Sequence, residues 1–398
     1  MDLQTIMEMD SKYYMNTFGS RMPVCFEYGK GIDLYDSKGR RYHDFLGGIA
    51  VNALGYGHPA LTKAVTAQAE KLIHCSNLYY IESQALLAKK LAENSCADRF
   101  FFANSGAEAN EGAIKLARIY FKKNGMPGKF GIITLKNSFH GRTLTTVAAT
   151  GQEKYQKPYA PLIPGFRHVP INDIETLKAA ISDETCAVMM ELVQGESGVH
   201  PLDTEYVKTV RKLCDENGLL LIIDEIQTGV GRTGKLFAYE HYGVEPDIFT
   251  LAKALAGGIP IGAVGAKEHI ASAFGPGDHG STFGGNPLAC SAALAVLDTI
   301  FEEHLTENAA NMGNYLKDQL TMLAEKYSII GSVRGLGLMV GIQLSQEKAV
   351  ELKGKLFDKG YLVGSVGSSV IRLLPPLIIS KTDIDSFITA LDEVLASL

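Results

Sequence analysis

The sequence of 398 residues lacks long apolar runs, basic clusters and closely spaced cysteine pairs. No stretch approaches the ~18 consecutive apolar residues of a membrane span, so no segment is expected to cross a membrane. The formal net charge of −6, without any lysine or arginine cluster, argues against nucleic acid or an anionic membrane as partner. The six cysteines have neither CxxC nor metal-ligand spacing, so we expect buried, reduced thiols and no metal site.

Other signals are also missing. The first residues, MDLQTIMEMDSKYY, carry acids where a secretory signal carries bases, and no apolar core follows them, so we expect a cytoplasmic protein. There is no tandem repeat, no low-complexity tract and no G-x-x-x-x-G-K-[ST] phosphate loop. The composition, 46% hydrophobic and 21% charged, is that of a globular protein, and the length suggests two or three domains.

Short apolar runs alternate with helical patterns through the middle of the chain. The predicted strands are Arg99–Ala103, Gly131–Leu135, Cys186–Val193, Leu219–Ile223, Asp247–Leu251 and Ile261–Ala266. This alternation predicts parallel βαβ units and an α/β fold.

We expect three parts along the chain. Residues 46–290 form a large domain, whose boundary lies within a long helix beginning near Pro287. Residues 291–398, with a strand at Gly337–Leu344 and another at Val370–Leu373, form a smaller α+β domain. Residues 1–45, with a β-hairpin in Phe26–Asp44, are expected to pack with the small domain.

Two of the predicted strands bring an acid and an amine to one place. The run Leu219–Ile223 ends on Asp224 and Glu225, and the run ending at Leu251 is soon followed by Lys253. The carboxyl ends of strands form the ligand-binding edge of an open α/β sheet. A carboxylate and an amine there favour an aldehyde cofactor with a ring nitrogen, pyridoxal phosphate. From these residues alone, a solvated lysine or a metal-binding acid pair remains an alternative.

Further candidate groups follow the earlier strands. Ser105 and Glu108 form an S-x-x-E capping box, and Gly106 and Ala107 leave the first N–H groups of the helix open to a phosphate. A capped helix without a ligand is the simpler interpretation. The segment SFHGRT adds an aromatic face and, at Arg142, a bidentate fork for a carboxylate.

Two glycine clusters need separate interpretation. Residues 229–234, GVGRTG, match the G-x-G-x-x-G fingerprint of nicotinamide enzymes, with Asp247 downstream. The fingerprint should follow its strand directly, yet five residues from Asp224 to Thr228 intervene, so a dehydrogenase stays only an alternative. The second cluster, Gly335, Gly337 and Gly341, lies in an alternating run and is interpreted as structural.

The motifs taken together resemble one family. SGAEANEGAIKLAR, SFHGRT, ELVQGESG, IIDEIQTGVGRTG, LAKALAGGIPIGA and HGSTFGGNPLA are similar to segments of the class III (subgroup II) aminotransferases of pyridoxal-phosphate fold type I. They occur in the family's order from about Phe26 to about Pro376. The resemblance implies a large domain with a mostly parallel seven-stranded sheet, a smaller α+β domain, and a homodimer with shared active sites.

The resemblance also implies roles for matching residues. Lys253 would carry the cofactor as a Schiff base, Asp224 would pair with the ring nitrogen, and Phe139 would stack on the ring. The other implied cofactor-binding residues are Ser105, Gly106, Ala107, His140, Glu225, Ile226, Gln227 and, from the second subunit, Thr282. The implied substrate-binding residues are Arg142, Ser281, Arg372 for the 2-oxoglutarate carboxylate, and Glu196, which masks Arg372 in the first half-reaction.

The family resemblance sets the expected reaction. It implies transfer of the δ-amino group of N-acetylornithine to 2-oxoglutarate, a step of arginine biosynthesis. Ornithine, succinyl-ornithine, succinyl-diaminopimelate and 4-aminobutyrate remain alternative donors. Phe18 stands where ornithine-specific relatives use Tyr, and its lack of a hydroxyl favours an acylated donor. A non-catalytic cofactor-binding or regulatory protein is the remaining alternative.

Overall fold

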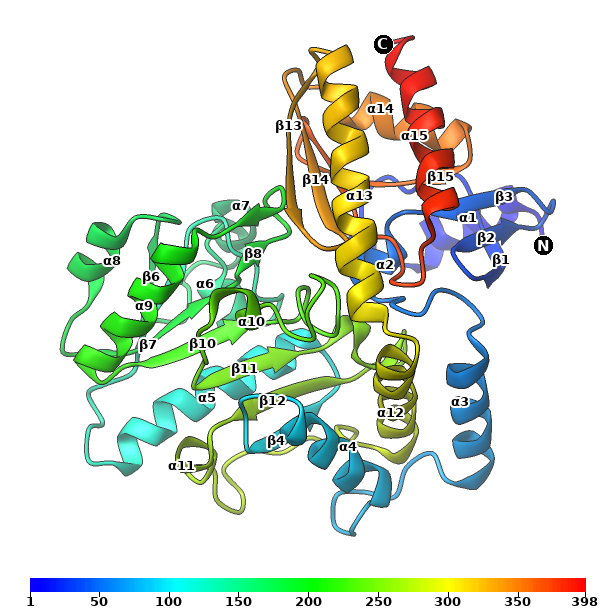
Figure 1. The fold of residues 1–398 in the computed structure, drawn as a ribbon. Coiled ribbons are helices and arrows are strands. Elements are labelled where there is room, and N and C mark those ends of the chain that lie inside the picture. The colour runs from blue at the N-terminus through cyan, green and yellow to red at the C-terminus, as the bar shows by residue number, and fades with distance from the viewer.

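The computed structural model describes residues 1–398, and a seven-stranded sheet is its largest element (Figure 1). The strand order is β4-β12-β11-β10-β7-β5-β6. The strands are β4 Arg99–Ala103, β5 Gly131–Leu135, β6 Phe166–Val169, β7 Thr185–Met190, β10 Leu220–Asp224, β11 Ile248–Leu251 and β12 Gly262–Ala266. Only β12 runs antiparallel to its neighbours, so the predicted mostly parallel sheet is confirmed.

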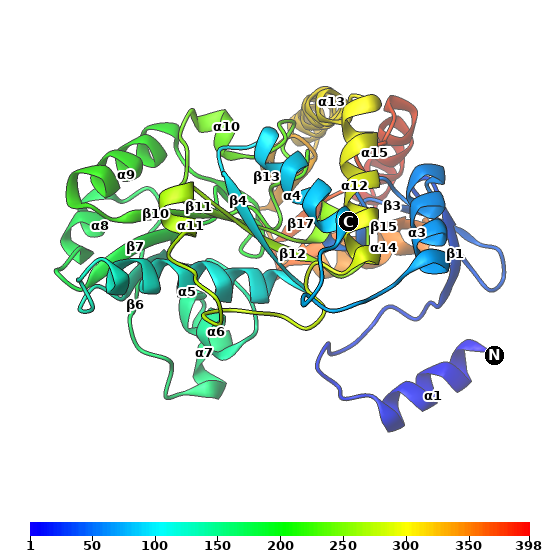
Figure 2. The ribbon, with the colours of Figure 1, turned by 90° about the horizontal axis from the view of Figure 1, so that it is seen from below.

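Helices cover both faces of this sheet, which explains why its central strands are buried along their whole length and mostly apolar (Figure 2). Alternate strand residues such as Ile222 pack with Ala113 and the rest of α5, Gly106–Lys123. Their neighbours, such as Ile223, pack on the other face with Val207 of α9, Thr204–Asn217. Because side chains alternate along a strand, successive residues of β10 pack on opposite faces of the sheet.

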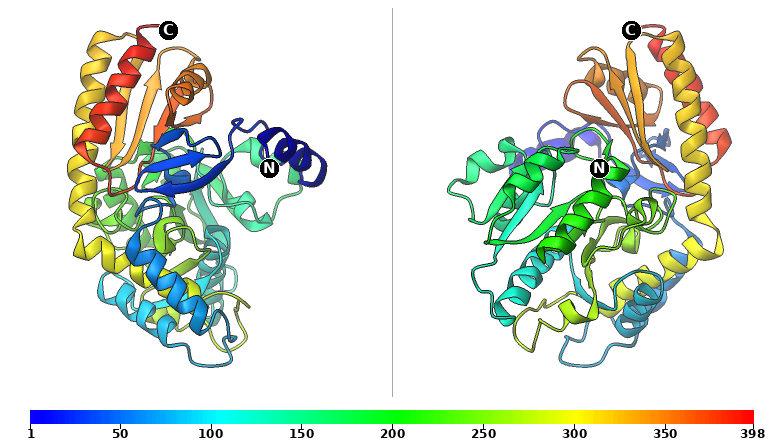
Figure 3. Two further views of the ribbon diagram at one scale, coloured as in Figure 1. Left: turned by 90° about the vertical axis from the view of Figure 1, so that its right-hand side faces the viewer. Right: turned by 60° about the vertical axis from the view of Figure 1, so that its left-hand side comes forward.

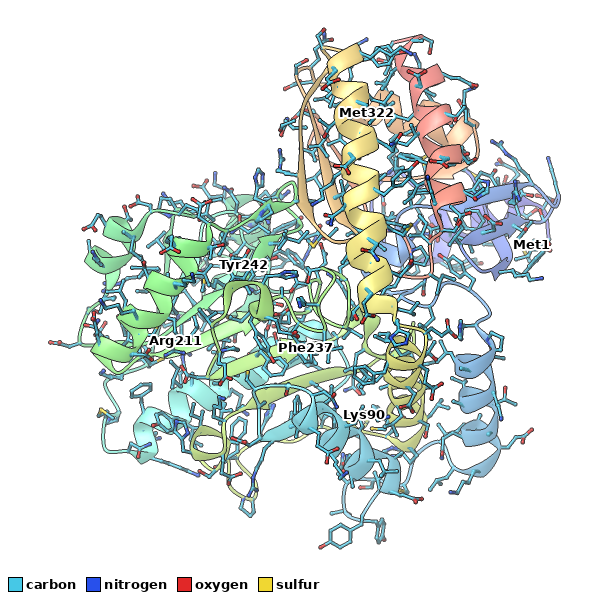
Figure 4. The ribbon with its side chains drawn as sticks, in the orientation of Figure 1. Met1, Lys90, Arg211, Phe237, Tyr242 and Met322 are labelled. Atoms are coloured by element: carbon cyan, nitrogen blue, oxygen red, sulfur yellow. The ribbon has the colours of Figure 1, made fainter.

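The remaining elements of this larger unit are short or peripheral. They are α2 Gly47–Ala50, α3 Pro59–Lys71, α4 Glu82–Glu93, α6 Leu144–Ala149, α7 Glu153–Gln156, η1 Lys157–Tyr159, α8 Ile174–Ala180, β8 Val193–Gln194, β9 His200–Pro201, α10 Tyr239–Tyr242, η2 Lys253–Ala256, α11 Glu268–Ala271 and α12 Pro287–Glu302. The predicted strand Cys186–Val193 is wrong at its end, because β7 stops at Met190 and β8 pairs with β9 instead. The buried side chains of Phe237 and Tyr242 fill the interior near α10 (Figure 4).

The smaller unit contains two four-stranded sheets and three helices (Figure 3). Its elements are β1 Phe26–Lys30, β2 Asp33–Asp36, β3 Arg41–Asp44, α13 Leu305–Lys326, β13 Ile330–Leu336, β14 Met339–Leu344, α14 Ala349–Asp358, β15 Tyr361–Leu362, β16 Gly364–Val366, β17 Val370–Leu373 and α15 Lys381–Leu395. Strand β3 pairs with β15, and Arg40 Nη2 donates to the Asp358 carbonyl oxygen at 2.7 Å. The N-terminal hairpin and the C-terminal part of the chain therefore share one sheet.

The contacts of two consecutive helices bear on where the units divide. Helix α12 packs against α3, α4 and η2, whereas α13 packs against β13 and α15. Between them, His304 has a left-handed backbone with φ 51°. Cys290 and Val296 of α12 are fully buried. We therefore propose the boundary at His304, rather than within α12 near residue 290.

The two glycine clusters of the sequence meet where the units join. Gly337 has φ 52° and lies in the turn between β13 and β14, not in a strand, and a Cβ there would stand 2.3 Å from the Thr233 backbone. The buried Arg232 donates through Nη1 to the Leu338 carbonyl oxygen at 3.1 Å and to that of Pro375. Leu338 N donates to the Arg232 carbonyl oxygen at 3.0 Å. Residues 229–234 thus form a joint between units.

One N-terminal helix was not predicted. Helix α1, Leu3–Tyr13, has no buried residue and stands apart from the body of the chain (Figure 2). Asp2 caps it by accepting from Thr5 N at 2.8 Å. No helix in the structure is both long and apolar enough to cross a membrane.

Candidate active site

A cavity of about 410 Å³ lies at the carboxyl edge of the large sheet. It is bounded by the ends of β10 and β11, the start of α5 and the loop that follows β5. The sequence-predicted residues that line it are Ser105, Gly106, Ala107, Phe139, His140, Arg142, Glu196, Asp224, Ile226, Gln227 and Lys253. The structure therefore gathers residues from five separate segments around one space.

The acid and the amine reach this cavity from neighbouring parallel strands. Asp224 ends β10 opposite Thr250 of β11, and Lys253 follows three residues later. Lys253 begins η2 with φ 38°, a strained backbone of the kind that clusters at functional sites. Burial lowers the pKa of the Lys253 amine, and the positive charge of Arg372 acts in the same direction. The amine is therefore closer to its neutral, nucleophilic form than a surface lysine.

Asp224 is held by three donors and is only 4% exposed. Its Oδ2 lies 2.8 Å from His140 Nδ1 and accepts from Asn110 Nδ2 at 2.8 Å. Its Oδ1 accepts from Ile226 N at 3.0 Å. Asn110 was not predicted from the sequence, although a polar residue on the core face of a predicted helix is a signal that could have found it.

The N-terminus of α5 forms the opposite end of the cavity. Ser105 Oγ caps the helix by accepting from Glu108 N at 3.2 Å. The reciprocal half of the capping box is wrong, because Glu108 Oε2 accepts from Asn104 N at 2.7 Å instead. A Cβ on Gly106 would stand 2.9 Å from the Ile226 side chain, which would have to shift, so glycine here keeps the backbone accessible. Open N–H groups and the helix dipole suit a phosphate.

A cation and two aromatic rings line the outer part of the site. The Arg142 guanidinium lies 4.2 Å from the ring centroid of Tyr155 and 5.6 Å from that of Phe139. Arg142 is exposed and has no carboxylate partner within the chain, so its fork is free for a ligand. Phe139 N donates to Glu191 Oε2 at 2.9 Å. Burial, together with the charge of Asp224, raises the pKa of Glu191 well above its ordinary value. Tyr155 and Glu191 were not identified from the sequence.

A second arginine is closed off by an acid. Arg372 of β17 donates through Nη1 to Glu196 Oε1 at 2.6 Å and to the Gly195 carbonyl oxygen at 3.1 Å. Gln227 Nε2 donates to the same Glu196 oxygen at 3.1 Å. Burial alone would raise the pKa of Glu196, but the charges of Arg372 and Lys253 overcome this and lower it. The pair is therefore charged at neutral pH.

Some predicted residues lie elsewhere. The Glu225 carboxylate faces away from the cavity and accepts from Tyr239 N at 2.9 Å and from Thr228, because neighbouring residues of a strand point to opposite faces. Its assignment to the cofactor is therefore withdrawn. Ser281 Oγ accepts from Asn104 Nδ2 at 3.1 Å outside the cavity. Thr282 is exposed and does not line the cavity of its own chain, and the same holds for Phe18.

The residues present fit pyridoxal phosphate. A buried carboxylate stands at one end of the cavity, an anion-binding helix terminus at the other, and a lysine and an aromatic ring between them. Gln227 Oε1 is buried without any partner in the protein, so a polar group of a ligand would satisfy it.

Comparison with known proteins gives one consistent family. The model of the aminotransferase class-III family matches residues 14–395. The acetylornithine aminotransferase of Methanocaldococcus jannaschii is 54% identical over all of both chains, and that of Caldanaerobacter subterraneus subsp. tengcongensis is 54% identical over 98% of each.

Solved structures agree with this family. The ornithine aminotransferase from Toxoplasma gondii superposes with a TM-score of 0.96 at 32% identity, covering 100% of this chain and 96% of that one. The N-acetylornithine aminotransferase from Stenotrophomonas maltophilia has a TM-score of 0.83 at 36% identity, covering 97% of this chain and 98% of that one.

Proposed function

This chain belongs to the class-III aminotransferases, and we propose that it moves the δ-amino group of N-acetylornithine to 2-oxoglutarate. It is a transaminase that depends on pyridoxal phosphate. The observation that carries the choice of donor is the 54% identity, over the full length, to relatives named for acetylornithine. The likeness to the ornithine enzyme of Toxoplasma gondii is weaker in sequence, at 32%.

The proposed roles divide between the two ends of the cavity. When bound, pyridoxal phosphate supplies an aldehyde carbon that takes up the amino group and a ring that accepts electrons. Asp224, held by its three donors, would face the ring nitrogen and favour its protonated form. Lys253 would hold the cofactor through its amine and, as a free amine beside the substrate, would move a proton to and from the substrate carbon. The N-terminus of α5 would hold the phosphate.

The two arginines support a site that takes two substrates in turn. Arg142 has a free fork and would hold the donor's carboxylate. Arg372 is paired with Glu196 and would become available only when that acid moves aside for 2-oxoglutarate. A switchable second anchor lets one pocket accept a monocarboxylate donor and then a dicarboxylate acceptor.

A donor panel with 2-oxoglutarate tests the substrate, scored by kcat/KM for N-acetylornithine, ornithine, succinyl-ornithine, succinyl-diaminopimelate and 4-aminobutyrate. We expect N-acetylornithine to lead. Ornithine well above its acetyl derivative would overturn the proposal.

A visible-range spectrum separates the other classes. The purified protein should show a cofactor band that disappears in Lys253→Ala. A colourless protein that binds NAD would support a dehydrogenase, and a coloured one without turnover on any amine would support a regulatory protein.

A homodimer with shared sites is also proposed. In the single chain, the large apolar side chains of Leu78, Tyr80 and Phe283 are exposed. They lie in the two segments that Asn77 and Ser281 join by a hydrogen bond, and the exposed Thr282 belongs to the second. If Thr282 serves the partner's cofactor, mixing Lys253→Ala chains with Thr282→Ala chains should create hybrid dimers with one intact site. Activity at limiting cofactor should then exceed that of either variant alone. No gain in verified hybrids would count against the shared site.

We also propose that the enzyme acts in the cytoplasm, in arginine biosynthesis. All six cysteines are unpaired, as a reducing compartment maintains them, and the amino donor belongs to that pathway. Loss of the gene should create a requirement for arginine, and growth without arginine would contradict the pathway assignment.

A further inference from the structure

The carboxamide of Asn110 lies buried between Asp224 and Thr250. Asn110 Nδ2 donates to Asp224 Oδ2 and to the His140 carbonyl oxygen, at 2.8 Å in each case. Thr250 Oγ1 donates to Asn110 Oδ1 at 2.8 Å. Asn110 and Thr250 are both 0% exposed. Every polar atom of the carboxamide is therefore satisfied within the protein.

The fold explains this arrangement. Asp224 and Thr250 are register partners on β10 and β11, so their side chains stand side by side on one face of the sheet. That face is the one covered by α5, since Ile222 and Ile248 pack there with Ala113. Asn110 comes one turn after Gly106, so one helix forms the anion site and reaches the ring-binding carboxylate.

We propose that Asn110 and Thr250 are positioning residues that fix Asp224 for the cofactor's ring nitrogen, an inference that rests on the proposed function. Only the observed orientation of the amide gives N–H donors to both Asp224 and His140. The reversed orientation would set a carbonyl oxygen against a carboxylate. In this orientation Asn110 Oδ1 is buried and points at Thr250, whose hydroxyl supplies the donor that this oxygen needs.

This hydrogen bonding leaves one oxygen of the Asp224 carboxylate partly free. Asp224 Oδ2 is occupied by two donors, Asn110 and His140, whereas Oδ1 has a single donor, the Ile226 N–H. A carboxylate oxygen can accept two hydrogen bonds, so Oδ1 keeps one position free. Without the Thr250 hydroxyl, Asn110 Oδ1 would be buried without a donor, and the carboxamide would hold Asp224 less firmly in its direction.

The test compares Thr250→Val, which keeps the shape and removes the donor, with Thr250→Ser, which keeps the donor. A matched control is Thr134→Val, because Thr134 is equally buried on β5 and bonds His168 Nδ1 at 2.7 Å, away from Asp224. Pyridoxal phosphate is titrated into each cofactor-free chain and followed by absorbance. We expect the dissociation constant to rise on the order of tenfold in Thr250→Val and to stay near wild type in the other two.

Two further measurements separate positioning from loss of stability. Thermal midpoints of the cofactor-free chains should fall similarly in Thr250→Val and Thr134→Val, while the pH dependence of the visible band should change only in Thr250→Val. Thr250→Val binding the cofactor as tightly as Thr250→Ser would overturn the proposal. Asn110→Asp, which removes both N–H donors of the carboxamide, is the second variant. Wild-type affinity of Asn110→Asp for the cofactor would overturn the proposal equally. A wild-type chain that takes up no cofactor would refute the proposed function instead.

Discussion

Replacing Glu196 by Gln should unmask Arg372 without changing the shape of the site. In the structure Glu196 Oε1 accepts from Arg372 Nη1 at 2.6 Å and from Gln227 Nε2 at 3.1 Å. The carbonyl oxygen of a glutamine can accept both bonds. The substitution therefore removes the charge and keeps the geometry, which makes it a clean test of the masking role.

The size of the effect follows from what 2-oxoglutarate must displace. A hydrogen bond to a charged partner contributes roughly 1.5–3 kcal/mol, against about 1 kcal/mol for a neutral one. The acceptor's carboxylate should thus gain about 0.5–2 kcal/mol in Glu196→Gln, which corresponds to a KM for 2-oxoglutarate lower by roughly two- to thirtyfold. The donor half-reaction should slow, because the open Arg372 competes with Arg142 for the donor's carboxylate.

Single-turnover spectroscopy measures the two half-reactions separately. Glu205→Gln serves as the control, since it removes the same charge from an exposed ion pair with Lys208. Glu196→Gln should also melt at lower temperature than wild type, and 2-oxoglutarate should restore much of the difference by pairing with Arg372. An unchanged KM for 2-oxoglutarate, or equal losses in both half-reactions, would refute the masking role.

Two other substitutions, both of residues that line the cavity, should give distinct outcomes. Asp224→Asn should lower kcat on the order of a hundredfold or more with little change in thermal midpoint, and near-normal turnover would contradict its role at the ring nitrogen. Arg142→Lys should raise the donor KM on the order of tenfold, because lysine loses the fork and the stacking on Tyr155; an unchanged KM would move the carboxylate anchor elsewhere.

Burial raises the pKa of Glu225 to about 7. As the pH rises, the unfolded chain therefore releases this proton before the folded chain does, and the free energy of unfolding falls until about pH 7. The total loss is on the order of 3 kcal/mol. Thermal melts of Glu225→Gln should lack that decline, and parallel curves for variant and wild type would show that Glu225 is not its source.

Sequence periodicity was sufficient for six of the seven strands of the large sheet, though not for β6, and for the edge where its ligand lies. The runs that end at Asp224 and before Lys253 are buried throughout and almost entirely apolar, because helices cover both faces of the sheet. Parallel strands place their ends together, so the acid and the amine could be brought to one cavity without coordinates. The domain boundary was harder to predict, because α12 is apolar enough to belong to either unit; the contacts of α12 support the boundary that we propose at His304.

Side-chain direction accounts for most of what the sequence did not reveal. Asp224 and Glu225 are adjacent and chemically alike, yet only the first faces the cavity. Asn110 belongs to the core face of α5, where a pattern of apolar residues hides a single polar one. Tyr155 reaches Arg142 only after the chain folds back through α6 and α7. Such contacts depend on tertiary geometry that local spacing does not encode.

The joint formed by Arg232 contacts its neighbours through main-chain oxygens, those of Leu338 and Pro375. A carbonyl oxygen is the same whichever residue carries it, so the side chains on the far side of this joint are free to change as long as the backbone path and Gly337 are kept. Small units from homologous enzymes should therefore be graftable onto this large unit, provided that the graft takes β1, β2 and β3 together with the chain after His304, because β3 pairs with β15. Chimaeras of this kind would exchange Arg372 of β17, the proposed anchor for 2-oxoglutarate, while leaving the proposed cofactor-binding residues of the large unit unchanged.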